Sequence, residues 1–192
     1  TTEVTVEDHI PPVAVCDQKT TVALTIDGTA KIEAYTFDDG SHDNCGIDYY
    51  EVKRMDNGYP CDSVRGKEWG PYAFFCCDDI GKTIMVAMRV WDRSGNSNTC
   101  MVEVEVQDKI PPVIFCPPHI TISCEYDYPD LNVFGTVVAD ISKQKAILIK
   151  DPKVKFSSQA IDGYAYDGCG VTVLELPPVY ALPCGKGTIT RT

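Results

Sequence analysis

Hydrophobic and polar residues alternate with a period of two along most of the chain. The alternation is clearest over residues 21–26, 30–37, 48–55, 83–91 and 99–106. In the last of these segments Cys100, Val102, Val104 and Val106 fall on one face, and Met101, Glu103 and Glu105 fall on the other. This pattern is typical of β-strands that cover a core with one face, so we expect that face to point inward.

Turn-forming sequences separate these segments about every ten residues. They read IDGTA, DDGSHDNCG, MDNGYP and DRSGNSN. No long segment has helical periodicity, so the sequence predicts an all-β fold, an antiparallel sandwich of the immunoglobulin type. In the last turn Asp92, Gly95 and Asn96 are expected to shape the hairpin through side-chain hydrogen bonds and a positive φ.

One sequence occurs twice, at a separation typical of a domain. VTVEDHIPPVAVC at residues 4–16 returns as VEVQDKIPPVIFC at residues 104–116, an offset of 110 − 10 = 100 measured between Ile10 and Ile110. Such a repeat predicts tandem domains. We expect residues 1–8 to be the last strand of a preceding repeat, residues 9–108 a complete repeat, and residues 109–192 a second repeat that is incomplete at its C-terminal hairpin.

The repeated sequence also marks the junctions between domains. Two consecutive prolines restrict both their own φ angles and the conformation of the residue before them, so the junction should be a short, stiff spacer. The predicted linker residues are Asp8, Pro11, Pro12, Asp108, Pro111 and Pro112.

Composition and charge exclude several classes of function. The 192 residues carry a net charge of −11 with no basic stripe, which argues against a nucleic-acid partner. No apolar run is long enough to insert into a membrane. Ten cysteines occur with three histidines and no CxxC motif, so disulfides are expected in place of zinc. Disulfides imply an oxidising compartment, hence an extracellular or cell-surface location.

The cysteine positions suggest specific pairs. Cys16 opens the first strand and Cys100 lies in the last, so we predict a bond between them. Cys76 and Cys77 should point to opposite faces of a strand and have different partners. We expect Cys45 to pair with Cys76 or Cys77, and Cys169 with Cys184, because DNCG at Cys45 corresponds to DGCG at Cys169. The partners of Cys61, Cys116 and Cys124 stay open; Cys116 would pair beyond Thr192.

The candidate chemistry points to binding, and we expect no enzymatic activity because no nucleophile, base and orienting group occur in a recognisable motif. Acidic side chains near the turns and junctions offer oxygen ligands for calcium. The candidate ligands are Asp8, Asp38, Asp39, Asp43 and Asp108.

Aromatic side chains cluster with basic ones around the middle loops. They are Tyr49, Tyr50, Tyr59, Trp69 and Tyr72, with Lys53, Arg54 and Arg65. Such a set suits a sugar-binding platform or a protein interface. Alternatively, Tyr49 or Tyr50 packs in the core and Trp69 covers a long loop.

The order D-x-x-P-P-x-x-x-C, D-N-C-G and W-D-x-x-G-N-x-x-x-C-x-V-x-V resembles the hyalin-repeat (HYR) family. The spellings DKIPPVIFCPPHITISC, FGPYAFFCCDDIG and VAMRVWDRSGNSNTC resemble repeats in giant surface proteins of Bacteroidota, such as SprB-like gliding-motility adhesins exported by type IX secretion. The resemblance implies immunoglobulin-like stalk repeats of an extracellular adhesin or filament. Neighbouring repeats of the same chain would be the main partners, with self-association into a fibre as a further expectation.

The alternative function is a module that binds a surface polysaccharide or a partner protein. It would act through the loop aromatics or through the insertion at residues 142–159, which lengthens the second repeat. That insertion is either an extra hairpin or a partner-binding loop.

Overall fold

The structure is a computed structural model that describes residues 1–56, 61, 68–122, 130–139, 146–147, 160–183 and 187–192. The chain divides into two compact units, Thr1–Ile110 and Pro111–Thr192. The boundary lies two residues after the one that the repeat predicts. Each unit is built from strands and short 3-10 turns, with no α-helix in the described part of the chain. Among these residues, no helix has the length and apolar character needed to cross a membrane.

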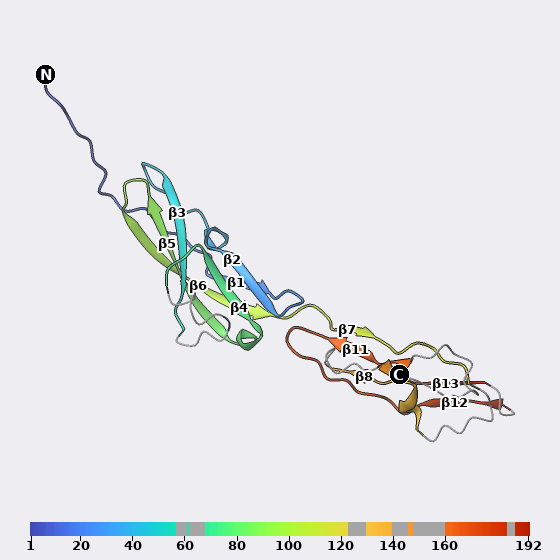
Figure 1. Cartoon of the computed structure of the whole chain (residues 1–192). Helices are drawn as coiled ribbons and strands as arrows, with labels where there is room; N and C mark the ends of the chain where they lie inside the picture. The colour runs from blue at the N-terminus through green and yellow to red at the C-terminus, as the bar shows by residue number, and fades with distance from the viewer. Residues whose placement is uncertain (57–60, 62–67, 123–129, 140–145, 148–159, 184–186) are drawn as a thin grey trace. The chain divides into compact units, whose positions relative to one another are not determined.

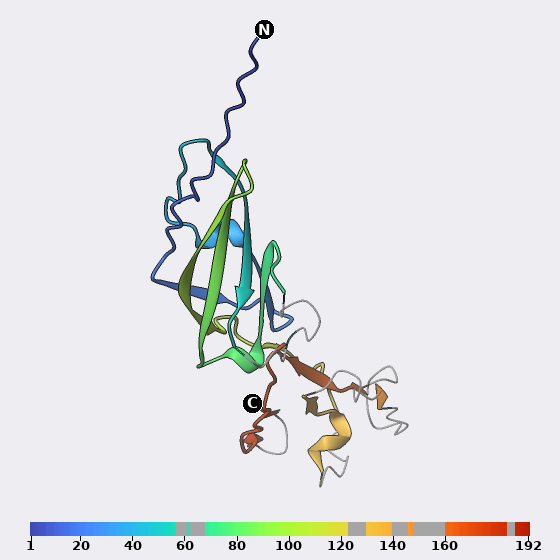
Figure 2. The ribbon, with the colours of Figure 1, turned by 90° about the vertical axis from the view of Figure 1, so that its left-hand side faces the viewer.

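The first unit contains two sheets (Figures 1 and 2). Four strands form one sheet in the order β1-β6-β5-β3, and β2 pairs with β4 in the other. The elements are β1 (Lys19–Ala23), β2 (Thr29–Glu33), η1 (Ala34–Phe37), β3 (Ile47–Arg54), β4 (Tyr72–Cys76), η2 (Cys77–Asp79), β5 (Thr83–Asp92) and β6 (Ser97–Gln107). The five predicted strands correspond to β1, β2, β3, β5 and β6, but η1 replaces the second half of the predicted segment 30–37.

The strand pairing of the first unit is antiparallel with one exception. β5 and β6 form the predicted hairpin, in register from Thr83 opposite Glu105 to Trp91 opposite Ser97. β1 pairs with β6 in parallel, from Lys19 opposite Glu103 onward. The first and last strands of the unit are therefore neighbours that run in the same direction.

The core lies between the inner faces of the two sheets. Val102, Val104 and Val106 of β6 are at most 1% exposed, which confirms the predicted inward face. Phe75 of β4 is also 1% exposed, and the guanidinium of Arg54 on β3 lies 5.2 Å from its ring centre. Burying each such apolar side chain contributes roughly 1.5–3 kcal/mol to folding.

The second unit is built from shorter strands. They are β7 (Val113–Phe115), β8 (Val137–Val138), β9 (Ala146–Ile147), β10 (Ala160–Ile161), β11 (Gly163–Tyr166), β12 (Val179–Ala181) and β13 (Thr188–Thr190), with one 3-10 turn, η3 (Leu131–Phe134). β11 lies between β7 and β8, and β12 pairs with β13. β9 lies within the predicted insertion and pairs antiparallel with β10, which directly follows the insertion. Residues 142–145 and 148–159 of the insertion lie outside the described residues.

Residues 1–8 form no strand in the structure, although the sequence predicts them to be the last strand of a preceding repeat. Val4 and Val6 are 80% and 90% exposed, although their counterparts Val104 and Val106 are buried. A strand requires a neighbour for its backbone hydrogen bonds, and no described strand pairs with this segment. Its assignment to a preceding repeat stays a prediction.

Candidate functional site

The entrance of the chain into the first unit is held by two asparagines of the β5–β6 hairpin. Asn96 Nδ2 donates to the carbonyl of Asp8 at 3.2 Å, and Asn98 Nδ2 donates to the carbonyl of Pro12 at 3.0 Å. Pro12 is itself fully buried. We call Asp8, Pro12, Asn96 and Asn98 the linker clamp. It attaches the predicted linker to the last hairpin of the unit that the linker enters.

The hairpin turn that carries the clamp is organised by Asp92, which is 2% exposed. Its Oδ1 accepts from the backbone N–H groups of Ser94 and Asn96 at 2.8 Å each, and its Oδ2 accepts from Asn96 Nδ2 at 2.8 Å. Gly95 has a φ of 88°, so the predicted turn chemistry is confirmed. Burial alone would raise the pKa of Asp92, but these hydrogen bonds outweigh it and lower the pKa.

The two linkers share one local hydrogen bond, from a backbone N–H to the aspartate two residues earlier. Asp8 Oδ1 accepts from the N–H of Ile10 at 3.0 Å, and Asp108 Oδ1 accepts from the N–H of Ile110 at 3.1 Å. Each aspartate thus fixes the backbone directly before its proline pair. This shared geometry explains why both copies of the repeated sequence carry aspartate at this position.

A disulfide joins the two ends of the first unit, as predicted. Cys16 and Cys100 are bonded with a Cα–Cα distance of 5.9 Å, and 84 residues separate them in the sequence. Cys16 lies three residues before the start of β1 and Cys100 lies within β6, so the bond connects the ends of the neighbouring first and last strands.

The predicted pairing of Cys45 with Cys76 or Cys77 is wrong. Cys45 is a free, exposed thiol, and Cys76 is bonded to Cys61. Cys45 precedes the start of β3. Cys76 lies at the other end of β3, because its N–H and the guanidinium of Arg54, the last residue of β3, both donate to Asp79. The eight residues of β3 place these ends roughly 25 Å apart, far beyond the reach of a disulfide. Cys77 does not lie on the strand with Cys76, because it begins η2.

The remaining cysteines are described in part. Cys77 and Cys169 are disulfide-bonded, and Cys116 is free and exposed. Cys184 and Cys124 lie outside the described residues, so the predicted Cys169–Cys184 bond stays a prediction. Disulfides in both units indicate a non-reducing environment.

Two of the predicted calcium ligands approach each other beside the linker clamp. Ligand atoms of Asp8, Asp43 and Cys45 all lie within 4.8 Å of one another. Asp8 Oδ2 is buried without a hydrogen-bond partner. The Asp8 carboxylate beside the thiol raises the pKa of Cys45.

This group suits calcium only in part. Calcium takes six to eight oxygen ligands, and a thiol is not among those it prefers. Asp38 and Asp39 lie outside the group, and the Asp38 carboxylate accepts from the N–H groups of Gly40 and Ser41. Of the predicted ligands, this group contains Asp8 and Asp43, and calcium binding, including any role of Asp108, stays a prediction.

The predicted aromatic cluster is partly realised on the outer face of the β3–β5 pair. Tyr49 is 45% exposed and stacks on Trp91, with 5.7 Å between ring centres and planes inclined by 13°. The Arg89 guanidinium lies 3.8 Å from the ring centre of Trp69. Both tryptophans of the chain therefore pack on charged and aromatic neighbours outside the core. Tyr59 and Arg65 lie outside the described residues.

Arg54 does not belong to this surface, because it is 3% exposed. Its Nη1 and Nη2 donate to the two carboxylate oxygens of the buried Asp79 at 2.8 Å each. It also donates to Asp56 and to the carbonyl of Phe74. Burial would lower the pKa of Arg54, but the two carboxylates outweigh it and raise the pKa. The position was predictable, because Arg54 lies on the same strand face as Val52.

The alternative prediction is that Tyr49 or Tyr50 packs in the core, but neither residue is fully buried. Tyr49 points outward, and Tyr50 is half-buried, with its ring edge-on to Tyr35 at 5.6 Å. Lys53 lies half-buried on the outer face beside Ala87. Neither tyrosine fills the core.

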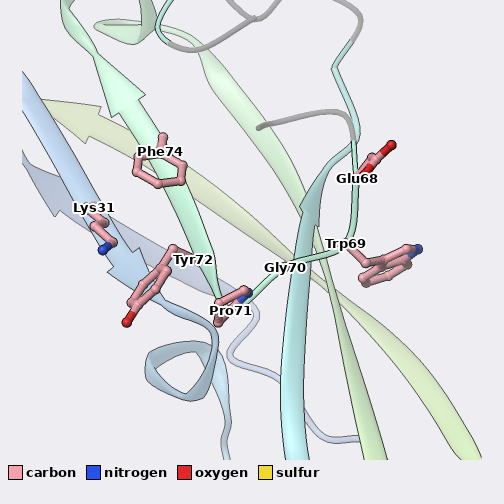
Figure 3. Close-up of a pocket in the computed structure, with 7 residues that line it drawn as sticks. All are labelled: Lys31, Glu68, Trp69, Gly70, Pro71, Tyr72 and Phe74. Atoms are coloured by element: carbon pink, nitrogen blue, oxygen red, sulfur yellow. The ribbon is translucent and has the colours of Figure 1, made fainter. Parts of the chain in front are cut away.

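A pocket opens where the chain enters β4 (Figure 3). Its volume is about 440 Å³, and its lining residues are Lys31, Glu68, Trp69, Gly70, Pro71, Tyr72 and Phe74. Lys31 Nζ lies 3.6 Å from the centre of the Tyr72 ring. In Figure 3 the Trp69 ring points away from Tyr72, on the other side of the segment that joins them. Trp69 and Tyr72 belong to the aromatic set that the sequence indicates, whereas Lys31 and Phe74 come from strands that meet only in the fold.

No protein family model, no curated protein and no solved structure matches this chain.

Proposed function

We propose that the chain consists of stalk repeats of a large secreted cell-surface adhesin. The linker clamp is the observation that carries this proposal. A flexible joint between domains needs no side chains that bind the linker backbone, whereas Asn96 and Asn98 hold it at two carbonyls. A linker stiffened by prolines and held in this way suits a rod of consecutive domains.

The topology supports an immunoglobulin-like classification of the first unit. Two facing sheets of four and two strands, with the first strand parallel to the last, are compatible with a sandwich of that type. The fold departs from the antibody pattern, since its two tryptophans lie outside the core and its disulfide joins the first and last strands. The resemblance to hyalin repeats of gliding-motility adhesins is part of this proposal and rests on sequence motifs alone.

The proposal predicts the shape of a chain with several consecutive repeats. Small-angle scattering should give an elongated rod whose length grows in proportion to the number of repeats. Replacing both Asn96 and Asn98 by alanine should increase the angular spread between neighbouring repeats. The exposed Asn44 provides the control substitution. A freely jointed ensemble for the unsubstituted chain would contradict the stalk proposal.

A second function, the binding of a surface glycan or a partner protein, is favoured by the exposed aromatic side chains. Tyr and Trp residues that lie outside a core present flat apolar faces with a polar edge, which is typical of binding surfaces. Tyr49 at 45% exposure and the half-buried Tyr72 have this character.

A further inference from the structure

We propose that the pocket at the start of β4 binds a ring of a neutral polysaccharide. The proposal rests on the second function above and does not depend on the stalk role. Its starting point is the pair Tyr72 and Phe74, which lie on the outer face of β4 while Ala73 and Phe75 between and beside them are buried. Two aromatic side chains on the outer face of a short strand are not needed to fill the core.

The walls of the pocket are fixed before any ligand arrives. Gly70 and Val52 exchange two backbone hydrogen bonds of 2.7 and 3.1 Å, and the carbonyl of Pro71 accepts from the N–H of Ala34 at 2.9 Å. These bonds attach the segment before β4 to β3 on one side and to η1 on the other. A binding surface that is already ordered loses little conformational entropy when it binds.

The far wall is held from inside the domain. Arg54 Nη1 donates to the carbonyl of Phe74 at 2.7 Å, and Arg54 is in turn fixed by Asp79. On the near wall, Lys31 Nζ holds the Tyr72 ring at 3.6 Å. The Tyr72 ring and the backbone of Phe74 are therefore each held by a basic side chain.

The size and the charge of the pocket decide the class of ligand. A volume of about 440 Å³ is within the range of small-molecule sites. Among its lining residues, Lys31 and Glu68 carry one positive and one negative charge, so their formal charges cancel. The net charge of −11 on the whole chain disfavours polyanions.

The chemistry of the lining matches a sugar ring. One face of such a ring presents C–H groups, which the negative face of an aromatic ring attracts, and its rim presents hydroxyl groups. Tyr72 and Phe74 provide the aromatic side, and Lys31 beside them can donate hydrogen bonds to hydroxyl oxygens, whereas the Glu68 carboxylate points away from these three side chains (Figure 3).

Affinity electrophoresis of the full chain tests the proposal. Soluble β-glucan, α-glucan and mannan serve as neutral probes, and alginate serves as the acidic one. We expect at least one neutral probe to slow the migration of the chain. Tyr72→Ala should weaken that binding by about tenfold, equivalent to the loss of one aromatic stacking contact. Lys31→Gln should weaken it several-fold, and because Lys31 is exposed this variant should retain the fold.

The control is Tyr35→Ala, which removes a tyrosine that is 67% exposed and does not line the pocket. Its binding should equal that of the unsubstituted chain. No retardation by any neutral probe, retardation by alginate alone, or equal binding by the Lys31→Gln variant would each overturn the proposal. These outcomes leave the scattering test of the stalk role unaffected, so the two proposals fail separately.

Discussion

At the scale of single residues, the most consequential position is a buried ion pair. Arg54 and Asp79 are 3% and 1% exposed and face each other through two hydrogen bonds. Asp79 also accepts from the N–H of Cys76 at 3.1 Å. The pair thus links β3, β4 and η2, and its charges are stable in the interior only while both partners are present.

Replacing Asp79 by alanine should destabilise the first unit by about 3–5 kcal/mol, because Arg54 would remain charged and buried without its main partner. Urea unfolding followed by tryptophan fluorescence measures the change. Lys19→Ala removes an exposed ion pair with Glu103 and Glu105 and is the control, with an expected change of about 1 kcal/mol or less. If both variants lose a similar amount of free energy of unfolding, Asp79 is not the main stabilising partner of Arg54.

The acidic turn residue Asp92 should make the domain sensitive to acid. Its pKa is lowered in the folded state, so the stability it contributes is present above the ordinary aspartate pKa and is lost as the pH falls through the lower, folded pKa. The free energy of unfolding should therefore fall below about pH 4. In Asp92→Asn the acid-induced loss should be smaller. If Asp92→Asn shows the same pH profile of stability as the unsubstituted chain, the acid sensitivity does not come from this turn.

Calcium binding by Asp8 and Asp43 can be tested by thermal melting. If the two carboxylates hold calcium, millimolar calcium should raise the melting temperature and a chelator should reverse the effect. Replacing both aspartates by asparagine should abolish the shift, and Asp78→Asn, at an exposed position, should preserve it. A melting temperature that does not change with calcium would contradict calcium binding by Asp8 and Asp43.

At the scale of elements, the first and last strands of the first unit are joined twice. β1 and β6 pair in parallel over five positions, and Cys16 is bonded to Cys100 beside them. The disulfide closes a loop of 84 residues, and the chain-entropy argument gives roughly 4–5 kcal/mol as an upper value for its contribution.

The double variant Cys16→Ser, Cys100→Ser should therefore lose up to about 4–5 kcal/mol of stability. Chemical denaturation without reductant measures this loss while the other disulfides stay intact. Cys45→Ser, which changes a thiol that is already free, should leave the stability unchanged. Equal behaviour of the two variants would show that the bond does not constrain the unfolded chain.

The period-two pattern predicts the buried face of β6 more clearly than that of β3. In β6 the period of two placed Val102, Val104 and Val106 correctly, because a strand with one buried face repeats its pattern without exception. The same period on β3 places Arg54 with Val52, although its charge suggested the surface. Its partner Asp79 lies 25 residues away, and no local pattern connects them.

The cysteine pairs show where sequence reasoning stops. Cys16 and Cys100 could be paired because the repeat places them near the start of the first strand and within the last strand. The partner of Cys45 could not be found in this way, since the sequence does not reveal at which end of the sandwich each cysteine lies. The pocket was hidden for the same reason, because Lys31 and Phe74 face each other only after β2 pairs with β4.

At the scale of the whole molecule, two units with their own internal contacts should unfold separately. Differential scanning calorimetry should resolve two transitions. The Cys16→Ser, Cys100→Ser variant should shift one of them and leave the other in place. A single transition that shifts as a whole would mean that the two units unfold cooperatively.

The parallel pairing of β1 and β6 has a mechanical consequence. When the two ends of the first unit are pulled apart, the load enters before β1 and leaves at the end of β6, so their backbone hydrogen bonds would be sheared together instead of opening one by one. With the Cys16–Cys100 bond intact, the load passes directly from one sulfur to the other. The 84-residue loop, which would add roughly 290 Å of contour length at about 3.5 Å per residue, then stays folded against extension. Oxidation thus makes this domain a link of nearly fixed length.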